Sequence, residues 1–348
     1  MKLAIMADLH FHAFKQFASR VDGDNSRFLE IIEAFSNAVE MAAEQECTAL
    51  LIAGDVFHAR GALRPSVFNR VFFEIAEAAG DMQVLIIPGN HDMENYRGGS
   101  TAVDTLHEME NVIVAKEPSC QVIVETTRSG SVRNLSVGCV PYIHDHEEFI
   151  VEAAKLVNAT KPEAMLIHQG IDDFADPGVP GTGLTIKRIR EFFDGPVFCG
   201  HYHGPEMIEN VFCVGSLVQH SFGDTSERGF WIYDTDTKAA KHVVVPGPRF
   251  LTVSSVKEAK AASGCYVRVM VDTLAKADKI SNAAFEAGAK GVTVVLERKF
   301  TAAHSSALKL STPKNMLAEY LGMQSDTKGR EGELMALFEA VCEGEAEV

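Results

Sequence analysis

The sequence predicts an α/β fold in which helices cover a sheet, followed by a small α+β unit and a helical tail. Two patterns predict the main fold: short apolar runs that recur along the chain, and helical patterns between the first of them. The third observation is length, because 348 residues exceed what one hydrophobic core usually serves. Apolar runs that are rich in Val, Ile and Leu and end at Gly, Pro or Asp are typical of buried strands. The predicted strands are Leu3–Ala7, Ala49–Ala53, Val84–Ile87, Leu135–Val140, Ala164–Ile167, Val197–Cys199, Val211–Val214 and Phe230–Tyr233.

Two stretches between these runs have apolar residues three and four positions apart, which is the spacing of one helix face. In the first stretch these residues are Phe28, Ile31, Ile32, Phe35, Val39 and Ala42. In the second they are Phe68, Val71, Phe72 and Ile75. Strands that alternate with such helices are expected to share one sheet, which the helices cover.

A Pro246-Gly247-Pro248 segment marks the end of the main domain, which is therefore predicted over residues 1–248. Residues 249–310 are predicted to fold as a compact α+β unit. Its predicted elements are strands at Cys265–Val271 and Gly291–Leu296 and a helix at Leu274–Ala287.

Residues 311–348 are predicted to form a helical tail, with short helices at 314–321 and 333–342. Thr312-Pro313 caps the first of them, and Gly322 stops it. Helices this short are not stable alone in water. Their apolar faces must therefore pack on the rest of the chain or dock on a partner.

Composition excludes several classes of protein. The seven cysteines are scattered without a CxxC pair, which argues against a disulfide framework or a cysteine zinc site and favours a reducing cytoplasm. No apolar run approaches the roughly 20 residues that span a bilayer. The first residues include too few apolar side chains to form the core of a signal peptide. The net charge of −16 is unusual for a nonspecific nucleic-acid binder, although residues 251–310 carry nine basic and five acidic side chains.

Polar side chains follow five of the predicted strands at their carboxyl ends. Open α/β sheets bind ligands just beyond this edge. A single histidine after a strand is more often structural, but five such groups at one edge are not explained by coincidence. In chain order the groups are Asp8-Leu9-His10, Gly54-Asp55-Val56-Phe57-His58, Pro88-Gly89-Asn90-His91-Asp92, His168 and Gly200-His201-Tyr202-His203.

This set of donors is typical of a metal site. Imidazole and carboxylate groups without thiolate suit manganese, iron or zinc rather than calcium. Seven candidate ligands are too many for one catalytic ion, which usually takes three protein ligands. Two ions that share a carboxylate fit the number, and such pairs hydrolyse phosphoesters. Asp55, next to a glycine that permits a tight turn, is the expected bridge.

Taken together, these five groups resemble the calcineurin-like metallophosphoesterases, whose fold is a β-sandwich flanked by helices. Within that superfamily the chain is similar to the nuclease subunits of the SbcD type, the meiotic-recombination-eleven DNA-repair nucleases and their phage counterparts. His58, three residues after Asp55, carries part of this resemblance. The segment from Gly215 to Asp224 with Arg228-Gly229-Phe230, and the unit and tail that follow, carry the rest.

The resemblance implies roles for individual residues. Asp8, His10, Asp55 and His203 would hold the first metal, and Asp55, Asn90, His168 and His201 would hold the second. His91 would stabilise the transition state or protonate the leaving oxygen, and His58 would contact the substrate phosphate. The expected metal is Mn²⁺, two ions per subunit, with Mg²⁺ as a substitute.

The resemblance also implies a function. The chain would be a metal-dependent exonuclease or endonuclease acting on DNA, in the cytoplasm of a bacterium or of a phage-infected cell. Residues 249–310 would cap the DNA, and residues 311–348 would dock on an SbcC-like ABC ATPase with a coiled coil. The helix around Phe68–Ile75, apolar on more than one face, would form a homodimer. The alternatives are a phosphodiesterase or phosphatase for small phosphoesters and a non-catalytic scaffold, although the scaffold should have lost ligands.

Candidate DNA contacts are basic residues near the predicted site, and each of them could equally be an ordinary solvated side chain. They are Arg60, Arg64, Lys187, Arg188 and Arg190. The chain departs from its relatives at Phe11-His12, where they often have a small residue. His12 is interpreted as a loop residue rather than an outer-shell group, and His144 and His146 as exposed loop histidines.

Overall fold

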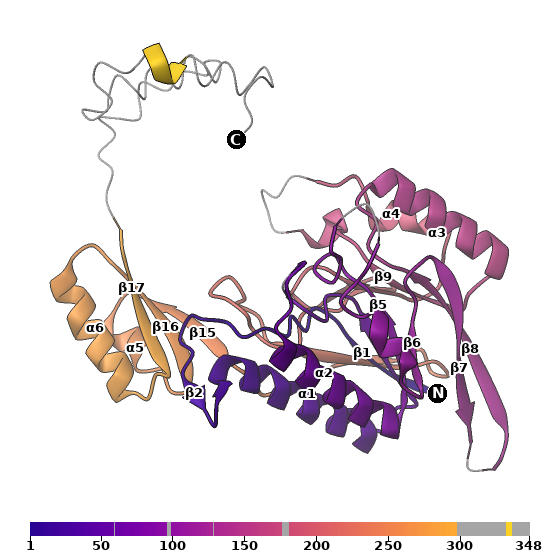
Figure 1. The fold of residues 1–348 in the computed structure, drawn as a ribbon, viewed down its shortest axis with the longest axis horizontal. Helices are drawn as coiled ribbons and strands as arrows, with labels where there is room; N and C mark the ends of the chain where they lie inside the picture. Colours follow the sequence, from indigo (N-terminus) through magenta and orange to yellow (C-terminus); the bar gives the residue numbers. More distant parts are fainter. Residues whose placement is uncertain (59, 96–98, 128, 176–180, 298–331, 336–348) are drawn as a thin grey trace. The chain divides into compact units, whose positions relative to one another are not determined.

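A computed structural model describes residues 1–58, 60–95, 99–127, 129–175, 181–297 and 332–335 (Figure 1). Residues 1–295 form one compact unit. This unit contains two six-stranded sheets and a smaller sheet of three strands. The predicted tail helix at 314–321 and most of that at 333–342 lie outside the described residues.

The first large sheet has the order β14-β13-β1-β4-β5-β6. Its four strands from β1 to β6 run parallel, and β13 and β14 continue it in antiparallel fashion. The strands are β1 (Lys2–Met6), β4 (Ala49–Ala53), β5 (Gln83–Ile87), β6 (Val112–Val114), β13 (Gly229–Asp234) and β14 (Ala240–Val244).

The second large sheet has the order β11-β12-β10-β9-β8-β7, with parallel strands in the middle and antiparallel strands at both edges. Its strands are β7 (Ser119–Thr126), β8 (Val132–Val140), β9 (Ala164–His168), β10 (Val197–Gly200), β11 (Glu206–Ile208) and β12 (Val211–Cys213). Side chains of both sheets, such as Leu3, Ile5, Leu166 and Phe198, share one buried core, so the sheets form a sandwich.

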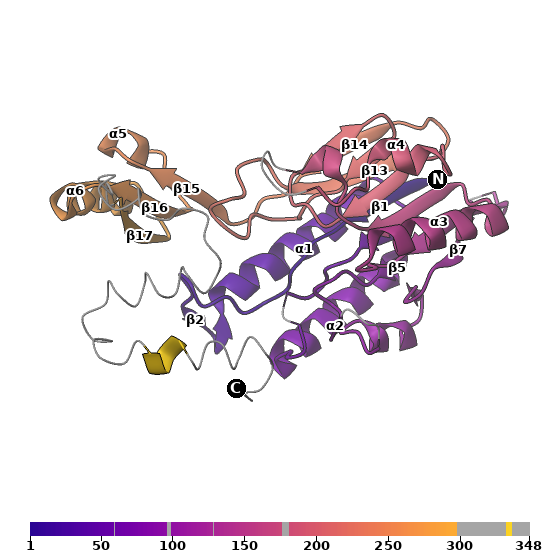
Figure 2. The same cartoon turned by 90° about the horizontal axis from the view of Figure 1, so that it is seen from above.

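Helices cover the outer faces of this sandwich. α1 (Ser26–Glu44) and α2 (Pro65–Asp81) pack on the first sheet, where Ala4 and Met6 point away from the core between the sheets (Figure 1). α3 (His146–Thr160) and α4 (Ile186–Arg190) pack on the second sheet (Figure 2). The alternation along β1 places each side chain from Leu3 to Met6 in one of two cores, which explains why these four residues are all apolar. The predicted α/β sandwich flanked by helices is therefore confirmed.

Short elements connect these layers. They are the hairpin β2 (Arg20–Val21) and β3 (Asp24–Asn25) and the 3₁₀ turns η1 (Asp104–Glu108) and η2 (Asp172–Phe174). α1 starts where Asn25 Oδ1 accepts a hydrogen bond from Phe28 N (3.0 Å), and α2 starts at Pro65.

The smaller sheet has the order β15-β16-β17 and belongs to an α+β unit with its own core (orange in Figure 1). Its elements are β15 (Arg249–Val253), α5 (Val256–Ala259), β16 (Cys265–Val271), α6 (Leu274–Glu286) and β17 (Gly291–Leu296). The strands and the helix that the sequence predicts here are all present. The domain boundaries at residues 248 and 310 remain predictions. Among the described residues, no helix combines the length and the apolar character that a membrane crossing requires.

Candidate metal centre

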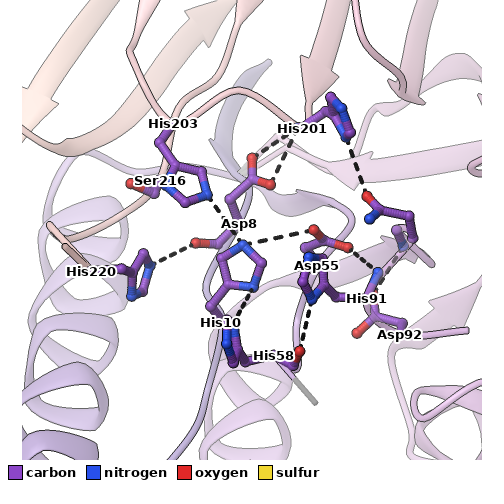
Figure 3. A network of polar contacts seen from close by, with 12 residues as sticks. Asp8, His10, Asp55, His58, His91, Asp92, His201, His203, Ser216 and His220 are labelled. Carbon is purple, nitrogen blue, oxygen red and sulfur yellow. Dashed lines mark hydrogen bonds and ion pairs between the residues drawn. The ribbon is translucent and has the colours of Figure 1, made fainter. Parts of the chain in front are cut away.

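The carboxyl ends of β1, β4, β5, β9 and β10 converge on one edge of the sandwich, and the seven predicted metal ligands meet there. Asp8 and Asp55 lie at the centre of a ring of imidazoles (Figure 3). Both carboxylates are buried, with 0% and 2% of their surface exposed. The predicted convergence of these strand ends is therefore what the structure shows.

Three overlapping groups of possible donor atoms lie here, and two of them consist of predicted metal ligands alone. One carboxylate oxygen of Asp8 and one imidazole nitrogen each of His10 and His203 lie within 4.8 Å of one another. The Nε2 atoms of the two histidines are 3.2 Å apart. A second group within the same limit joins Asp8 and Asp55 to His168.

Asp55 stands between the two groups. Its Oδ2 lies 3.7 Å from His10 Nε2 and its Oδ1 lies 3.6 Å from His168 Nε2. Beyond His168, the amide oxygen of Asn90 lies 3.1 Å from His168 Nε2 and 3.2 Å from His201 Nδ1. Asp55 thus has the position that a carboxylate shared by two metal ions would occupy.

The backbone is strained at four of these ligands. The φ angles of Asp8, His10, Asp55 and His201 are 50°, 45°, 52° and 114°, a region that side-chain-bearing residues rarely adopt. Such strain costs of order 1–3 kcal/mol per residue and is kept where the surrounding structure enforces it, often at functional sites.

Glycines allow the loops to approach so closely. A Cβ atom on Gly89 would overlap the Asp55 carboxylate and its main-chain nitrogen, so only glycine fits beside the expected bridge.

His91 and His58 flank the metal centre. His91 N donates to Asp55 Oδ1 (2.8 Å), and His91 Nδ1 donates to the carbonyl oxygen of His58 (2.7 Å). Because a carbonyl only accepts, this contact fixes the His91 tautomer and leaves Nε2 as the atom that can act on a substrate. The two rings stack with centroids 5.3 Å apart.

Burial governs the protonation of the site. It raises the pKa of Asp8 to about 6 and lowers the pKa of His201 to about 3 and that of His10 well below its ordinary value. The last two histidines are therefore neutral near pH 7, which is the form that binds a metal.

For His203, burial acts to lower the pKa, but the hydrogen bond to Asp224 and the charge of Asp8 outweigh it and raise the value. For His168, burial is likewise outweighed by the charges of Asp55 and Asp8, which raise its pKa.

The donor set fits divalent cations. A buried carboxylate needs a charged partner or a metal. Within the described part of the chain, Asp55 forms ion pairs with His10 and His168, and neither Asp55 nor Asp8 pairs with a lysine or an arginine. Two buried carboxylates, an amide oxygen and neutral imidazoles make a site suited to ions such as Mn²⁺ or Zn²⁺.

Three residues that contact the predicted ligands or their loops were given no role from the sequence: Asp92, His220 and Asp224. Asp92 accepts hydrogen bonds from the main-chain nitrogens of Val56, Phe57 and Gly89, and thereby ties two ligand loops together. Burial raises the pKa of Asp92 to about 7. Asp224 and His220 contact His203 and Asp8, as described below. Asp92 and Asp224 stand in the motifs quoted above, but no spacing reveals such contacts across loops.

The predicted DNA contacts are spread over two regions. Arg188 pairs with Glu147, and Arg190 Nη1 donates to the carbonyl oxygens of Phe193 and Gly195, so both already serve the fold around α4. Lys187 is exposed on the same helix.

Arg60 and Arg64 are exposed in the stretch before α2. The charge of Arg64 assists burial in lowering the pKa of His12, whose ring lies 5.1 Å from that of His58. His12 therefore adjoins the centre from its loop.

The interpretation of His146 was wrong. It is half-buried and is the first residue of α3, which starts here because Asp145 caps the helix by accepting a hydrogen bond from Glu148 N (2.9 Å). His144 is an exposed loop residue, as expected.

Comparison with known proteins gives relatives of two kinds. A putative phosphoesterase 244L of Invertebrate iridescent virus 6 is 24% identical over 205 residues, which cover 58% of this chain and 69% of the viral protein. The DNA double-strand break repair protein Mre11 of Methanopyrus kandleri is 25% identical over 337 residues, which cover 86% of this chain and 71% of that protein. Among solved structures, the calcineurin-like phosphoesterase YfkN of Bacillus subtilis aligns with a TM-score of 0.42 and 14% identity, over 71% of this chain and 89% of that one.

The family model of the calcineurin-like phosphoesterases matches residues 1–225. This range contains every predicted metal ligand and both histidines that flank them. The chain belongs to the calcineurin-like phosphoesterase family.

Proposed function

We propose that this phosphoesterase is a metal-dependent DNA nuclease that hydrolyses phosphodiester bonds, the nuclease subunit of an SbcCD-like complex for double-strand break repair or recombination. The observation that carries the proposal is the arrangement of donors around Asp55, which suits two metal ions and a phosphodiester. The similarity to Mre11 of Methanopyrus kandleri supports DNA as the substrate, since it extends over 86% of the chain and hence beyond the family domain.

The residues have distinct parts in the proposed reaction. Asp8, His10, Asp55 and His203 would hold one Mn²⁺, and Asp55, Asn90, His168 and His201 the other. The two ions would supply positive charge to the phosphate and lower the pKa of a water molecule. His91, held by the His58 carbonyl, would stabilise charge on the phosphate through Nε2 or protonate the leaving oxygen. His58 would contact the phosphate beside it.

The proposal includes partners. α2 buries Val67, Val71 and Ile75 against the sheet, whereas Phe73 on the same helix is 68% exposed. An exposed phenylalanine on a helix that is already packed favours a homodimer through α2. We further propose that residues 311–348 bind an SbcC-like ABC ATPase. Deletion of these residues should then abolish complex formation, and an intact complex would contradict this part.

A phosphodiesterase or phosphatase for small phosphoesters is the second candidate. It is favoured by the similarity to the viral phosphoesterase, whose aligned part covers only 58% of this chain. The same metal centre would serve both functions, so substrate tests must separate them.

The test measures hydrolysis of linear duplex DNA, single-stranded DNA and an aryl phosphodiester, each with Mn²⁺, Mg²⁺ or a chelator. The variants are Asp55→Asn and His91→Ala, and the control is Asp81→Asn, an exposed carboxylate at the end of α2. We expect Mn²⁺-dependent loss of DNA that both site variants reduce by at least 100-fold and the control retains. Turnover of the aryl ester without any cleavage of DNA, even with the ATPase partner present, would favour the second candidate.

A further inference from the structure

The segment between β12 and β13 contacts the metal centre through two side chains, Asp224 and His220. Asp224 is 6% exposed and lies within hydrogen-bond distance of His203, a predicted metal ligand. We infer that Asp224 is a positioning residue, which holds His203 in the tautomer and ring orientation that metal binding requires. The inference rests on the metal centre of the proposed function and adds a residue to which neither the resemblance nor the donor set gives a role.

The position of the Asp224 carboxylate does not depend on His203. Oδ2 accepts hydrogen bonds from the main-chain nitrogens of His220 and Ser221, both 2.9 Å away, and from Ser221 Oγ (3.3 Å). Oδ1 accepts from Arg228 Nη2 (2.9 Å), which is itself buried. Four donors on its own segment thus fix the carboxylate before it meets the histidine.

The contact with Asp224 determines which nitrogen of His203 faces the ligands. A carboxylate between so many donors stays ionised, so His203 Nδ1 must carry the hydrogen and donate to Oδ1 (3.2 Å). The other nitrogen, Nε2, then faces His10 Nε2 at 3.2 Å, within the donor group that includes Asp8. His168 is fixed in the same way, because its Nδ1 donates to the carbonyl oxygen of Ala53 (2.7 Å). Such partners orient the imidazole and make it a better ligand.

The same segment supports a second ligand of the first metal. His220 Nε2 donates to the carbonyl oxygen of Asp8 (3.2 Å), at a residue whose backbone is strained. On the other side, Phe222 packs on Phe250, with ring centroids 5.1 Å apart, and lies 4.8 Å from the Arg268 guanidinium. The α+β unit therefore packs against this segment, and the segment in turn contacts two predicted ligands, His203 and Asp8.

A purely structural role for Asp224 is the rival explanation, because its loss could loosen the whole segment. The two roles differ in which metal is affected. A positioning residue acts through His203 and should weaken only the ion that His203 binds. A loosened segment would also shift Asp8 and disturb the neighbouring ion through the shared Asp55.

The experiment is a Mn²⁺ titration of the full chain. Calorimetry and electron paramagnetic resonance of the bound ion both measure the binding. The variants are Asp224→Asn, His203→Ala and the double variant. The matched control is Asp172→Asn, a carboxylate that fastens another loop by accepting hydrogen bonds from Thr182 and Gly183. Circular dichroism checks that each variant is folded.

We expect Asp224→Asn to weaken one of two Mn²⁺ sites by about 10- to 100-fold, as is typical for such partners, and the control to leave both unchanged. In the His203→Ala background, Asp224→Asn should leave the remaining site as it is. Equal affinities in Asp224→Asn and wild type would overturn the role of Asp224 and leave the metal centre standing. A further loss in the double variant would show the structural role instead. Absence of Mn²⁺ binding in the wild type would overturn both the inference and the proposed metal centre.

Discussion

Individual residues at this centre are held in place by neighbouring loops. The chain after β1 and the chain after β4 are joined by hydrogen bonds from Asp8 N to Gly54 O (3.0 Å) and from His10 N to Asp55 O (3.0 Å). These bonds supply energy that keeps three of the four strained ligands in the left-handed region. The ligand positions are therefore a property of the folded chain, and a metal would bind to a preformed site.

At the residue scale, we predict that metal binding competes with protons. Burial raises the pKa of Asp8 to about 6, so this carboxylate takes up a proton as the pH falls from 7 to 5, and the bond to Asp224 helps to raise the pKa of His203, which favours its protonated form too. A metal needs both groups deprotonated. The affinity for Mn²⁺ should therefore fall with decreasing pH in this window, roughly tenfold per pH unit for each displaced proton.

Calorimetry in two buffers of different ionisation enthalpy measures this proton release directly. His10 and His201 should contribute nothing, because burial keeps them neutral at these pH values. An affinity that is constant between pH 5 and pH 8 would contradict the prediction.

At the scale of elements, the sequence predicts best what is buried on both sides. β1, β4 and β9 lie between two cores and read as continuous apolar runs, so their ends and the ligands after them could be located. β7 was missed because it lies at a sheet edge with only Ile123 buried, and α3 was missed because only Phe149 and Ala153 of its residues are buried.

The candidate site, too, could be predicted from the sequence only in part. The ligands follow strands, so their convergence could be predicted from the direction of parallel strands. Asp224 acts through a fold of the chain that brings it beside His203, 21 residues earlier, and no local pattern encodes that contact. Contacts of this kind arise only from the tertiary structure.

α2 has a strongly exposed phenylalanine, Phe73, on a face that does not pack on the sheet. If the proposed dimer forms through α2, a charge at the exposed Phe73 must be buried at the interface, which is costly. Phe73→Glu should therefore yield a monomer by light scattering at a protein concentration where the wild type is dimeric. The control is Val151→Glu on α3, also exposed at 48%. A Phe73→Glu protein that remains dimeric would place the interface elsewhere.

For the molecule as a whole, the contacts between α1 and the α+β unit connect the sandwich with the chain that follows residue 248. Arg27, with 2% of its side chain exposed, lies 4.6 Å from the ring centre of Tyr266 and 4.8 Å from that of Phe250. Glu30 accepts hydrogen bonds from Tyr266 Oη (3.0 Å) and Lys290 Nζ (2.6 Å), and lies 3.4 Å from Arg27 Nε. One carboxylate thus connects a buried cation on α1 with two residues of the unit that follows residue 248.

Glu30 is therefore where a single change should separate the two parts. In Glu30→Ala, Arg27 loses its ion pair while still buried, and the Tyr266 hydroxyl loses its acceptor, so we expect a loss of about 2–3 kcal/mol in the free energy of unfolding. Urea unfolding measures this loss, with Glu33→Ala on the exposed face of α1 as a control that should change it by less than about 0.5 kcal/mol. Because the contacts between α1 and the α+β unit are far weaker in the variant, circular dichroism and the fluorescence of Trp231, in β13 of the sandwich, should report separate transitions where the wild type shows one. Coincident transitions of unchanged midpoint in Glu30→Ala would mean that the other contacts of the α+β unit, such as those of Arg27 and Phe222 with its aromatic rings, are enough to hold it to the sandwich.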